Sequence, residues 1–345
     1  MKNRRIATLV GFCLLLVWGC MPLANAHAKS ATKMPRVMNL VTHRMGSFSY
    51  GVAAGYAKVG SKYLPTEIKA VPTSGPSEWV PMAYDGEVDM VWGNAFDSRE
   101  AYYGIGAFEG KKSSNMMILA RGGPLVISTL TQRDSGIKKL SEAKGKRYIL
   151  YSGGRAFTQL GLGFLANAGL TRDDVRVFMV PGPVAGVKAL IEGRADVAGT
   201  AALVMGVVAE LEAGKGARFL SIDPSPEGVR RLYTQFPVGK PHLVKPGPKV
   251  RGVTEPTWFW AYDWYILASK NLNDDIVYEL TKTYYNHDKE LWPIHPALRG
   301  SKKETFVVED ASLPYHPGAV KYYREVGTWT ANADKLQKQL LSKRK

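Results

Sequence analysis

The sequence predicts an α/β fold made of two similar lobes with a ligand cleft between them. Two segments align without a gap when the chain is shifted by 107 residues, which places Gly75-Pro76 over Gly182-Pro183. The matches fall at loops and helix ends, where glycine and proline have backbone roles. Each copy also alternates strands with helices, a pattern typical of parallel βαβ units. In such sheets ligands bind outside the carboxyl ends of the strands, so two facing units predict a shared cleft.

The two copies have the same order of elements: strand, glycine turn, helix, strand, Gly-Pro turn, helix and third strand. The expected strands are Val37–Val41 and Glu67–Val71 in the first copy, and Tyr148–Tyr151 and Val175–Val180 in the second. Gly86 and Gly193 are expected to end the second helix of each copy, and each third strand leaves through Asp89 or Asp196.

Beyond residue 235 a connector rich in proline and glycine leads to an expected strand, "TWFWAYDWYILAS", and a helix capped by Asn273 or Asp274. Trp258, Trp260 and Trp264 would share one face of that strand, which is either core or cleft. The tail is expected to return to the first lobe, with hinges near Ala120–Ser128 and Gln235–Val244. The expected division is therefore signal peptide 1–28, first part of lobe 1 29–122, lobe 2 123–239, and return to lobe 1 with C-terminal helices 240–345.

The N-terminus has the pattern of a cleaved secretory signal peptide. Lys2, Arg4 and Arg5 precede the apolar run of residues 6–18, and small residues follow at 24–28. Both cysteines, Cys13 and Cys20, lie in this leader, so the mature chain is expected to be periplasmic and free of disulfides. Lipid anchoring at Cys20 is the alternative, although the bulky Trp18 fits that signal poorly.

The formal net charge is +16, but lysines and arginines are spread along the chain rather than gathered in a stripe. This distribution favours a basic surface that attracts small anions over a nucleic-acid partner. The sequence lacks GxSxG, HExxH, Walker A and EF-hand patterns, and its histidines are scattered. We therefore expect no catalytic residue, no metal and no cofactor, in a soluble monomer.

Arg155 is the most informative single residue. It stands in the first turn of an expected helix, after Gly153-Gly154, where a cation faces the positive end of the helix dipole. A guanidinium beside free backbone N–H groups suits a carboxylate or phosphate. The alternative is a surface arginine paired with a nearby acid such as Asp173. Arg44, in the opposite lobe's loop, is either a second anion ligand or merely exposed.

The organisation of the chain resembles the TAXI solute receptors, the extracytoplasmic binding proteins of one branch of TRAP transporters. The resemblance rests on the leader, the repeat, "GRADVAGTA" and "HPGAVKYYREVGTW" (residues 316–329), and it covers nearly all of the mature chain. It implies a type II periplasmic-binding-protein fold that closes around a small organic acid, such as a carboxylate, and delivers it to an ion-driven membrane permease. The loops depart from the family pattern at residues 43–48, 95–96 and 155–157, which favours an anion with a larger or more apolar body.

The expected ligand-binding residues lie in the loops that would face the cleft: Arg44, Gly46, Ser47, Phe48, Ser49, Ser74, Asn94, Gly154, Arg155, Ala156, Phe157, Thr158, Thr200 and Trp258. Two other functions remain open. One is the receptor of an ATP-driven importer for aromatic or sulfonated anions, and the other is a periplasmic enzyme that uses the same cleft.

Overall fold

Ten strands form one mixed sheet in the order β2-β1-β3-β10-β4-β7-β5-β6, with β8 paired to β4 and β9 paired to β10. The computed structural model describes residues 33–110 and 115–343, so the expected signal peptide and Cys20 lie outside it. From Lys33 onward the chain forms one compact unit. Among the described residues no helix has both the length and the apolar character that a bilayer crossing requires.

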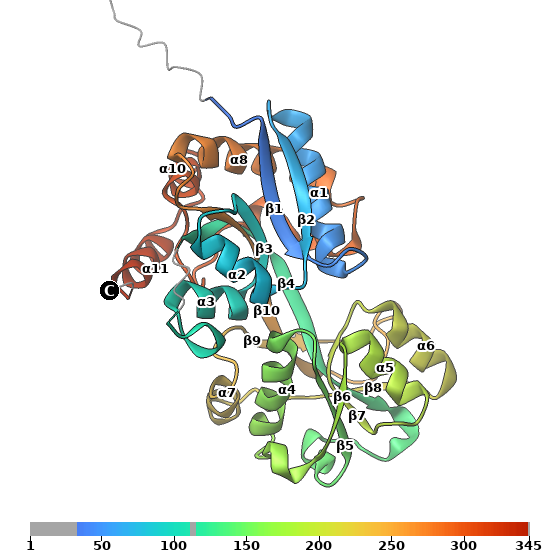
Figure 1. Cartoon of the computed structure of the whole chain (residues 1–345). Coiled ribbons are helices and arrows are strands. Elements are labelled where there is room, and N and C mark those ends of the chain that lie inside the picture. Colours follow the sequence, from blue (N-terminus) through green and yellow to red (C-terminus); the bar gives the residue numbers. More distant parts are fainter. Residues whose placement is uncertain (1–32, 111–114, 344–345) are drawn as a thin grey trace, which may run out of the picture. The chain divides into compact units, whose positions relative to one another are not determined.

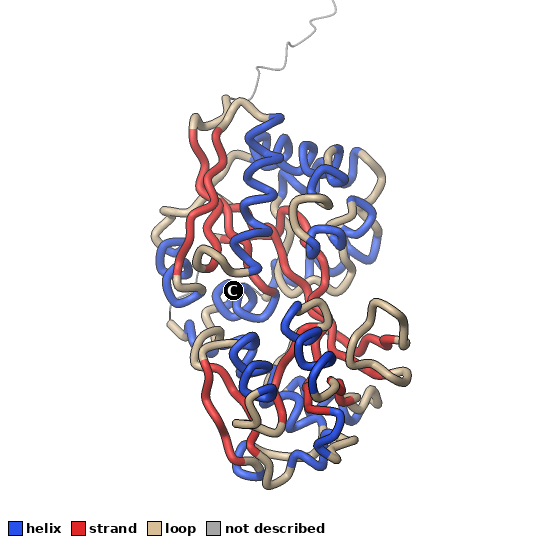
Figure 2. The backbone as a smooth tube through the Cα atoms, turned by 90° about the vertical axis from the view of Figure 1, so that its right-hand side faces the viewer, coloured by secondary structure: helices blue, strands red, loops and turns tan. Residues whose placement is uncertain are grey.

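The repeat predicted from the sequence is present in the fold. The first half contains β1 (Val37–His43), α1 (Phe48–Tyr63), β2 (Glu67–Thr73), α2 (Pro76–Tyr84), β3 (Met90–Asn94) and α3 (Ala95–Tyr103). The second half follows the same order with β5 (Arg147–Tyr151), α4 (Arg155–Asn167), β6 (Arg176–Val180), α5 (Pro183–Ile191), β7 (Val197–Ala202) and α6 (Gly206–Gly214). β1 pairs in parallel with β2 and β3, and β5 with β6 and β7, as expected for βαβ units. In both halves helices flank the strands (Figure 2).

Two long strands join the halves (Figure 1). β4 (Met116–Gln132) and β10 (Thr257–Ser269) pair with each other in antiparallel fashion. β10 also pairs with β3 of the first half, and β4 with β7 of the second. The expected strand at residues 257–269 is thus confirmed. The segment 120–128, expected to be a hinge, lies inside β4, and 235–244 ends in β9 (Lys240–Val244).

The remaining elements are β8 (Ala217–Leu220) and α7 (Pro226–Tyr233) in the second half, and α8 (Asp274–Asn286), α9 (Asp288–Leu291), α10 (Pro317–Glu325) and α11 (Ala331–Ser342) in the tail. The predicted cap of α8 is confirmed, since the Asn273 side chain accepts a hydrogen bond from the Asp275 N–H at 2.8 Å. The tail returns to the first half, because α8 packs on α1 and on α10.

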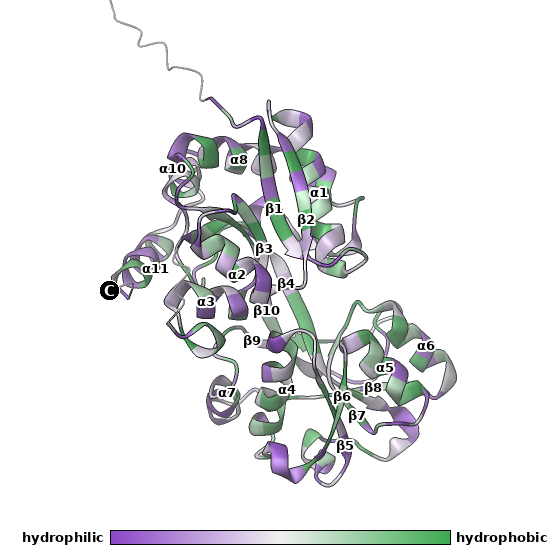
Figure 3. Ribbon diagram, viewed as in Figure 1, coloured by the Kyte–Doolittle hydropathy of each residue, from purple (hydrophilic) through white to green (hydrophobic). Residues whose placement is uncertain are grey.

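Apolar side chains place the core on the faces of the sheet. All five residues of β3, Trp92 among them, are buried, and so is Trp260 of β10. The colouring by hydropathy shows the apolar strands inside the molecule (Figure 3). One large cluster fills the first half and extends to α4, and a smaller one fills the second half between β5, β7 and α5.

The acids of the repeat, Asp89 and Asp196, are structural. Asp89 Oδ2 accepts a hydrogen bond from the Asn39 N–H of β1 at 2.8 Å, and Asp196 Oδ2 accepts one from the Arg147 N–H of β5, also at 2.8 Å. Each carboxylate therefore ties the third strand of its half to the start of the first strand. These residues lie at the amino ends of the strands, away from the edge where ligands bind in α/β sheets.

Candidate anion-binding site

The N-terminus of α4 is the strongest candidate for an anion site. The helix begins after Gly154, whose φ of 97° favours glycine, and no side chain caps its first turn. The first backbone N–H groups of a helix have no partner within the helix and carry a partial positive charge. Gly153 belongs to the same turn, and its N–H is occupied by Pro181 O at 3.1 Å. In the described part of the chain no hydrogen bond is found for the N–H groups of residues 154–156, so they are available to an anion.

Arg155 forms an ion pair with Glu100 of α3, in the other half of the molecule. Arg155 Nη1 donates a hydrogen bond to Glu100 Oε2, so the partner of Arg155 is Glu100 and not Asp173. The guanidinium also lies over the ring of Phe96 at 5.2 Å. Glu100 is buried, whereas the Arg155 side chain is 35% exposed. Because arginine has five N–H donors, the contact with Glu100 leaves donors for a ligand.

Arg44 reaches the same turn from the first half. It is exposed in the loop between β1 and α1, and a methyl group added at Gly153 would lie 3.7 Å from Arg44 Nη2. Within residues 33–110 and 115–343 no ion pair is found for Arg44. The structure therefore brings two of the expected residues, Arg44 and Arg155, to the start of α4.

Several other expected residues use their polar atoms inside the fold. Ser47 Oγ caps α1 by accepting from the Tyr50 N–H at 3.2 Å, and Ser74 Oγ donates to Glu78 at 2.8 Å. Asn94 caps α3, since its Oδ1 accepts from the Asp97 N–H at 2.9 Å. Thr158 Oγ1 donates to Tyr151 O at 2.6 Å. Their side chains hold helix ends in place.

The remaining expected residues differ in burial. Ser49, Ala156 and Thr200 are buried, and Thr200 Oγ1 meets no hydrogen-bond partner in the described part of the chain. Gly46, with φ of 80°, is exposed in the β1–α1 loop. Phe157 and Trp258 are partly buried against the core. Of the three tryptophans expected on one face of β10, Trp260 and Trp264 are core residues.

An aromatic cluster lies beside the strand ends of the first half. Phe48 meets Trp264 edge to face, with ring centroids 5.6 Å apart, and Trp92 stacks on Trp264 at 5.6 Å. Phe96 stacks on Phe236 with ring centroids 4.6 Å apart, and the Phe236 ring packs edge to face on Tyr262. Of these rings, Phe96 lies against the Arg155 guanidinium and so connects the cluster to the α3–α4 ion pair.

Sequence reasoning missed the buried polar atoms at the end of β1, directly after β3 and in the middle of β10. Asp97 is 2% exposed, and burial raises its pKa to about 6 even though the Asn94 amide bonds to its Oδ2. Its Oδ1 has no hydrogen-bond partner among the residues described, nor have Tyr262 OH and Trp264 Nε1. Burial lowers the pKa of His43 to about 4, so this ring is neutral. The sequence did contain a signal for a buried carboxylate at this edge, namely the two acids of "NAFDSRE" directly after the third strand.

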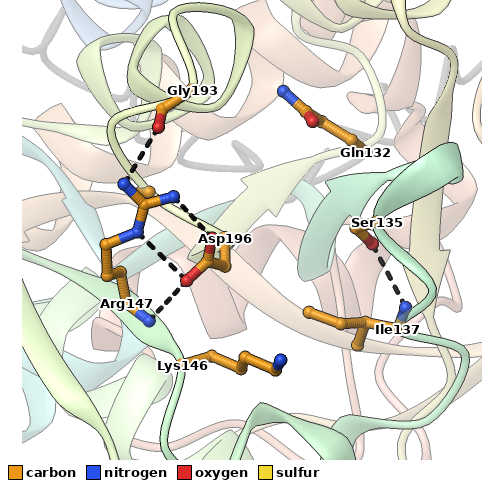
Figure 4. A pocket seen from close by; sticks show the side chains of 8 residues that line it. Gln132, Ser135, Ile137, Lys146, Arg147, Gly193 and Asp196 are labelled. Carbon is orange, nitrogen blue, oxygen red and sulfur yellow. Dashed lines mark hydrogen bonds and ion pairs between the residues drawn. The ribbon is translucent and has the colours of Figure 1, made fainter.

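A separate cavity of about 150 Å³ lies at the opposite ends of the strands (Figure 4). Its wall contains the Arg147–Asp196 pair, with Arg147 Nη1 also donating to Gly193 O at 2.9 Å. These groups are already satisfied by one another and hold the βαβ unit together. The described residues contain no cluster of three or more His, Cys, Asp or Glu suited to a metal ion.

Comparison with known protein families identifies the chain. The model of the NMT1-like family matches residues 40–327. The chain belongs to the NMT1-like family. Among solved structures, PhnD1 from Prochlorococcus marinus, in complex with methylphosphonate, matches with a TM-score of 0.53 and 14% identity, covering 86% of this chain and 100% of the other. The predicted α/β periplasmic-binding-protein fold is thereby confirmed.

Two further solved structures are periplasmic sulfonate-binding proteins. SsuA from Escherichia coli, an aliphatic sulphonate binding protein, matches with a TM-score of 0.44 and 14% identity over 89% of both chains. The sulfonate-binding protein SsuA from Methylobacillus flagellatus, assigned to a putative sulfonate ABC transporter, matches with a TM-score of 0.49 and 14% identity. The match covers 86% of this chain and 87% of the other. At 14% identity these matches show the fold alone.

The expected membership among the TAXI receptors of TRAP transporters is wrong. The family that matches is the NMT1-like family, and PhnD1, the similar structure with a TM-score of 0.53, is in complex with methylphosphonate. The expectation of a carboxylate ligand is corrected with it. A resemblance carried by the order of weak motifs follows from the shared βαβ architecture, which does not distinguish between transporter types.

Proposed function

We propose that the protein is the substrate-binding protein of an ATP-driven importer and captures small organic phosphonates or sulfonates in the periplasm. Membership of the NMT1-like family and the fold match to PhnD1 support a ligand-binding role. This is the alternative left open by the sequence. The importer's membrane subunits would be its partners, and the expected leader at residues 1–28 would direct its export.

The observation that carries this proposal is the start of α4. Its uncapped backbone N–H groups, Arg155 on the same turn and Arg44 from the other half can surround a tetrahedral oxyanion. Phosphonate and sulfonate groups present three oxygens, which suits one helix N-terminus and two guanidinium groups. Gly154 and Ala156 would contribute backbone N–H groups. Phe157, beside Gly154, and Phe48, in the loop that carries Arg44, would contact the organic part of the ligand.

Because the two arginines come from different halves, the ligand would bridge them. A ligand that contacts both halves favours the state in which they are close, so binding shifts the population toward closure. The movement would be centred where the paired strands β4 and β10 pass between the halves.

The test is a thermal-shift and calorimetric screen of the mature protein with methylphosphonate, methanesulfonate and acetate. At a ligand concentration 100 times the Kd, binding adds about 2.7 kcal/mol to the free energy of unfolding. We expect the melting temperature to rise with at least one of the first two ligands and not with acetate. The ligand concentration in both measurements reaches about 10 mM, enough to detect even a Kd of about 1 mM. If neither methylphosphonate nor methanesulfonate raises the melting temperature or gives binding heat there, the proposed ligand class is wrong.

A further inference from the structure

Asp97 presents a buried carboxylate oxygen that nothing in the described chain satisfies. The residue lies in the first turn of α3, at the carboxyl end of β3, and its side chain is held by Asn94 Nδ2 at 2.6 Å through Oδ2. Oδ1 is left without a donor. A buried polar atom without a partner costs about 1–3 kcal/mol, and more when it is charged. Such an atom at a binding edge points to a ligand that supplies the missing hydrogen bond.

The surroundings of Asp97 connect it to the proposed anion site. Glu100, one turn further along α3, raises its pKa, whereas the Arg155 charge from α4 lowers it, so both groups act on the carboxyl. Asp97 in turn raises the pKa of Tyr262 on β10. Tyr262 OH is itself buried, and its nearest polar side chains are those of Asp97 and Trp264. The unpaired acceptor of Asp97 therefore lies between Tyr262 and the Arg155–Glu100 pair.

Phosphonates and sulfonates differ in the proton that they can bring to such a site. A sulfonate has three acceptor oxygens and no donor, so an ionised Asp97 repels it. A phosphonate monoanion has the same shape but carries one O–H group, which can donate to a carboxylate, and charge-assisted hydrogen bonds of this kind are strong. A sulfonate can make the same contact only when Asp97 itself carries the proton.

We propose that Asp97 Oδ1 accepts a hydrogen bond from the ligand and makes the protein select phosphonate monoanions over sulfonates. This inference rests on the proposed function, since it places the ligand at α3 and α4. Tyr262 OH would donate to a second ligand oxygen, and Arg155 and Arg44 would neutralise the charge. No group is transferred, because the proton stays between the ligand oxygen and the carboxylate.

The experiment is calorimetric titration of methylphosphonate and methanesulfonate, which have the same shape, from pH 5 to pH 8. Sulfonate binding requires a protonated Asp97, so its affinity should fall about tenfold per pH unit above 6. Methylphosphonate affinity, expressed per monoanion, should stay constant above pH 6, where Asp97 is ionised. At pH 7 the monoanion of methylphosphonate should therefore bind about tenfold tighter than methanesulfonate.

Asp97→Asn is the decisive variant, because the amide has the same shape and donates a hydrogen bond at every pH. It should bind methanesulfonate with an affinity that no longer depends on pH, and should lose at least about tenfold for the phosphonate monoanion. Asp85→Asn removes an exposed carboxylate near the end of α2 and should change neither. Circular dichroism checks that each variant is folded.

A second measurement needs no variant. Sulfonate binding at pH 7 should take up close to one proton, read from the binding heats in buffers of different ionisation enthalpy. If both ligands bind without proton uptake and Asp97→Asn changes neither affinity, Asp97 does not face the ligand, and the proposed function survives without this inference. If neither ligand binds the unmodified protein, the proposed ligand class itself is overturned.

Discussion

The two halves share one backbone plan but differ in how their helices begin. In the first half, Ser47 caps α1 and Asn94 caps α3 with their own side chains. In the second half, the counterparts α4 and α6 begin without any side-chain cap. A capped helix has satisfied part of its N-terminal N–H groups, whereas an uncapped one keeps them for water or a ligand. The second half is therefore the one equipped to receive an anion through its backbone.

The two halves also differ in the charged side chains at these helix starts. α3 carries the buried acids Asp97 and Glu100, whereas a shift of 107 residues places Val204 and Val207 at the corresponding positions. The second half supplies Arg155 instead, and it pairs with Glu100. The repeated fold thus places buried acids in the first half and an arginine with free backbone N–H groups in the second, while Arg44 adds a cation from the first half. Four predictions test this division, in order of decreasing effect.

The largest effect concerns the stability contributed by Asp97. Its pKa is raised from 3.8 to about 6, so the folded protein holds this proton more tightly than the unfolded chain does. The free energy of unfolding should therefore fall as the pH rises from 3.8 to 6, by up to about 3 kcal/mol, and stay level above 6. In Asp97→Asn, which has no carboxyl group to titrate at this position, the fall in the free energy of unfolding between pH 3.8 and 6 should be absent. Urea denaturation at pH 4, 5, 6 and 7 measures it, and identical profiles for the two proteins would contradict the assignment.

Arg155→Ala should weaken methylphosphonate binding at least about thirtyfold, because removing one member of a buried charged contact costs about 2–5 kcal/mol. The variant should also be less stable than the parent, since buried Glu100 loses its partner. Arg172→Ala removes an exposed arginine of the same half and serves as the control. Calorimetric titration gives the affinities. Undiminished binding by Arg155→Ala would leave Arg44 as the main anion ligand.

Gly154→Ala should lower the free energy of unfolding by about 1–2 kcal/mol, because a side chain at φ of 97° is strained. The added methyl group would also lie 3.0 Å from the Phe157 ring. Gly182 is the matched control, since it precedes α5 with an extended φ of −178° and open space around its Cα. Gly182→Ala should stay close to the parent in chemical denaturation. Equal losses in the two variants would show that φ at the start of α4 is not the cause.

The smallest effect is expected for Ser47→Ala. Loss of an N-cap costs about 1 kcal/mol of stability. Ligand affinity should not change, because Ser47 Oγ is already engaged with the Tyr50 N–H. Ser77→Ala, in the exposed first turn of α2, controls for loss of a hydroxyl group. A drop in affinity without a drop in stability would return Ser47 to the ligand site.

Local patterns in the sequence predicted the framework well. The strand at Thr257–Ser269 and the cap at Asn273 follow from alternation and capping rules that act over a few residues. The repeat succeeded for a related reason, because Gly86 and Gly193 each have positive φ and the spacing between them preserves the helix ends. These features need no information about distant parts of the chain.

The site was harder to predict because its contacts are distant in sequence. Arg155 and Glu100 are 55 residues apart, and no periodicity relates an α3 acid to an α4 cation. Asp173, named as an example of a partner in the alternative interpretation, is near Arg155 in sequence, whereas the actual partner, Glu100, is near it only in the fold. Asn94 and Ser47 illustrate the opposite error, since each stands three residues before the N–H that it caps, a spacing typical of N-caps. That spacing was visible in the sequence and argued for a structural role.

β4 and β10 have a mechanical consequence for the molecule. They cross between the halves as hydrogen-bonded partners, with register shifts at Trp264/Tyr265 and Ile266/Leu267 and the Arg121–Asp263 ion pair at 2.7 Å between them. Any rotation of one half against the other has to be absorbed as torsion of this two-stranded ribbon. A ribbon that stays paired resists torsion elastically, as a spring does, whereas a pair of loops turns freely. The angle between the halves is then set by the ribbon at rest, and a ligand that changes it works against a restoring force that also helps to release the ligand.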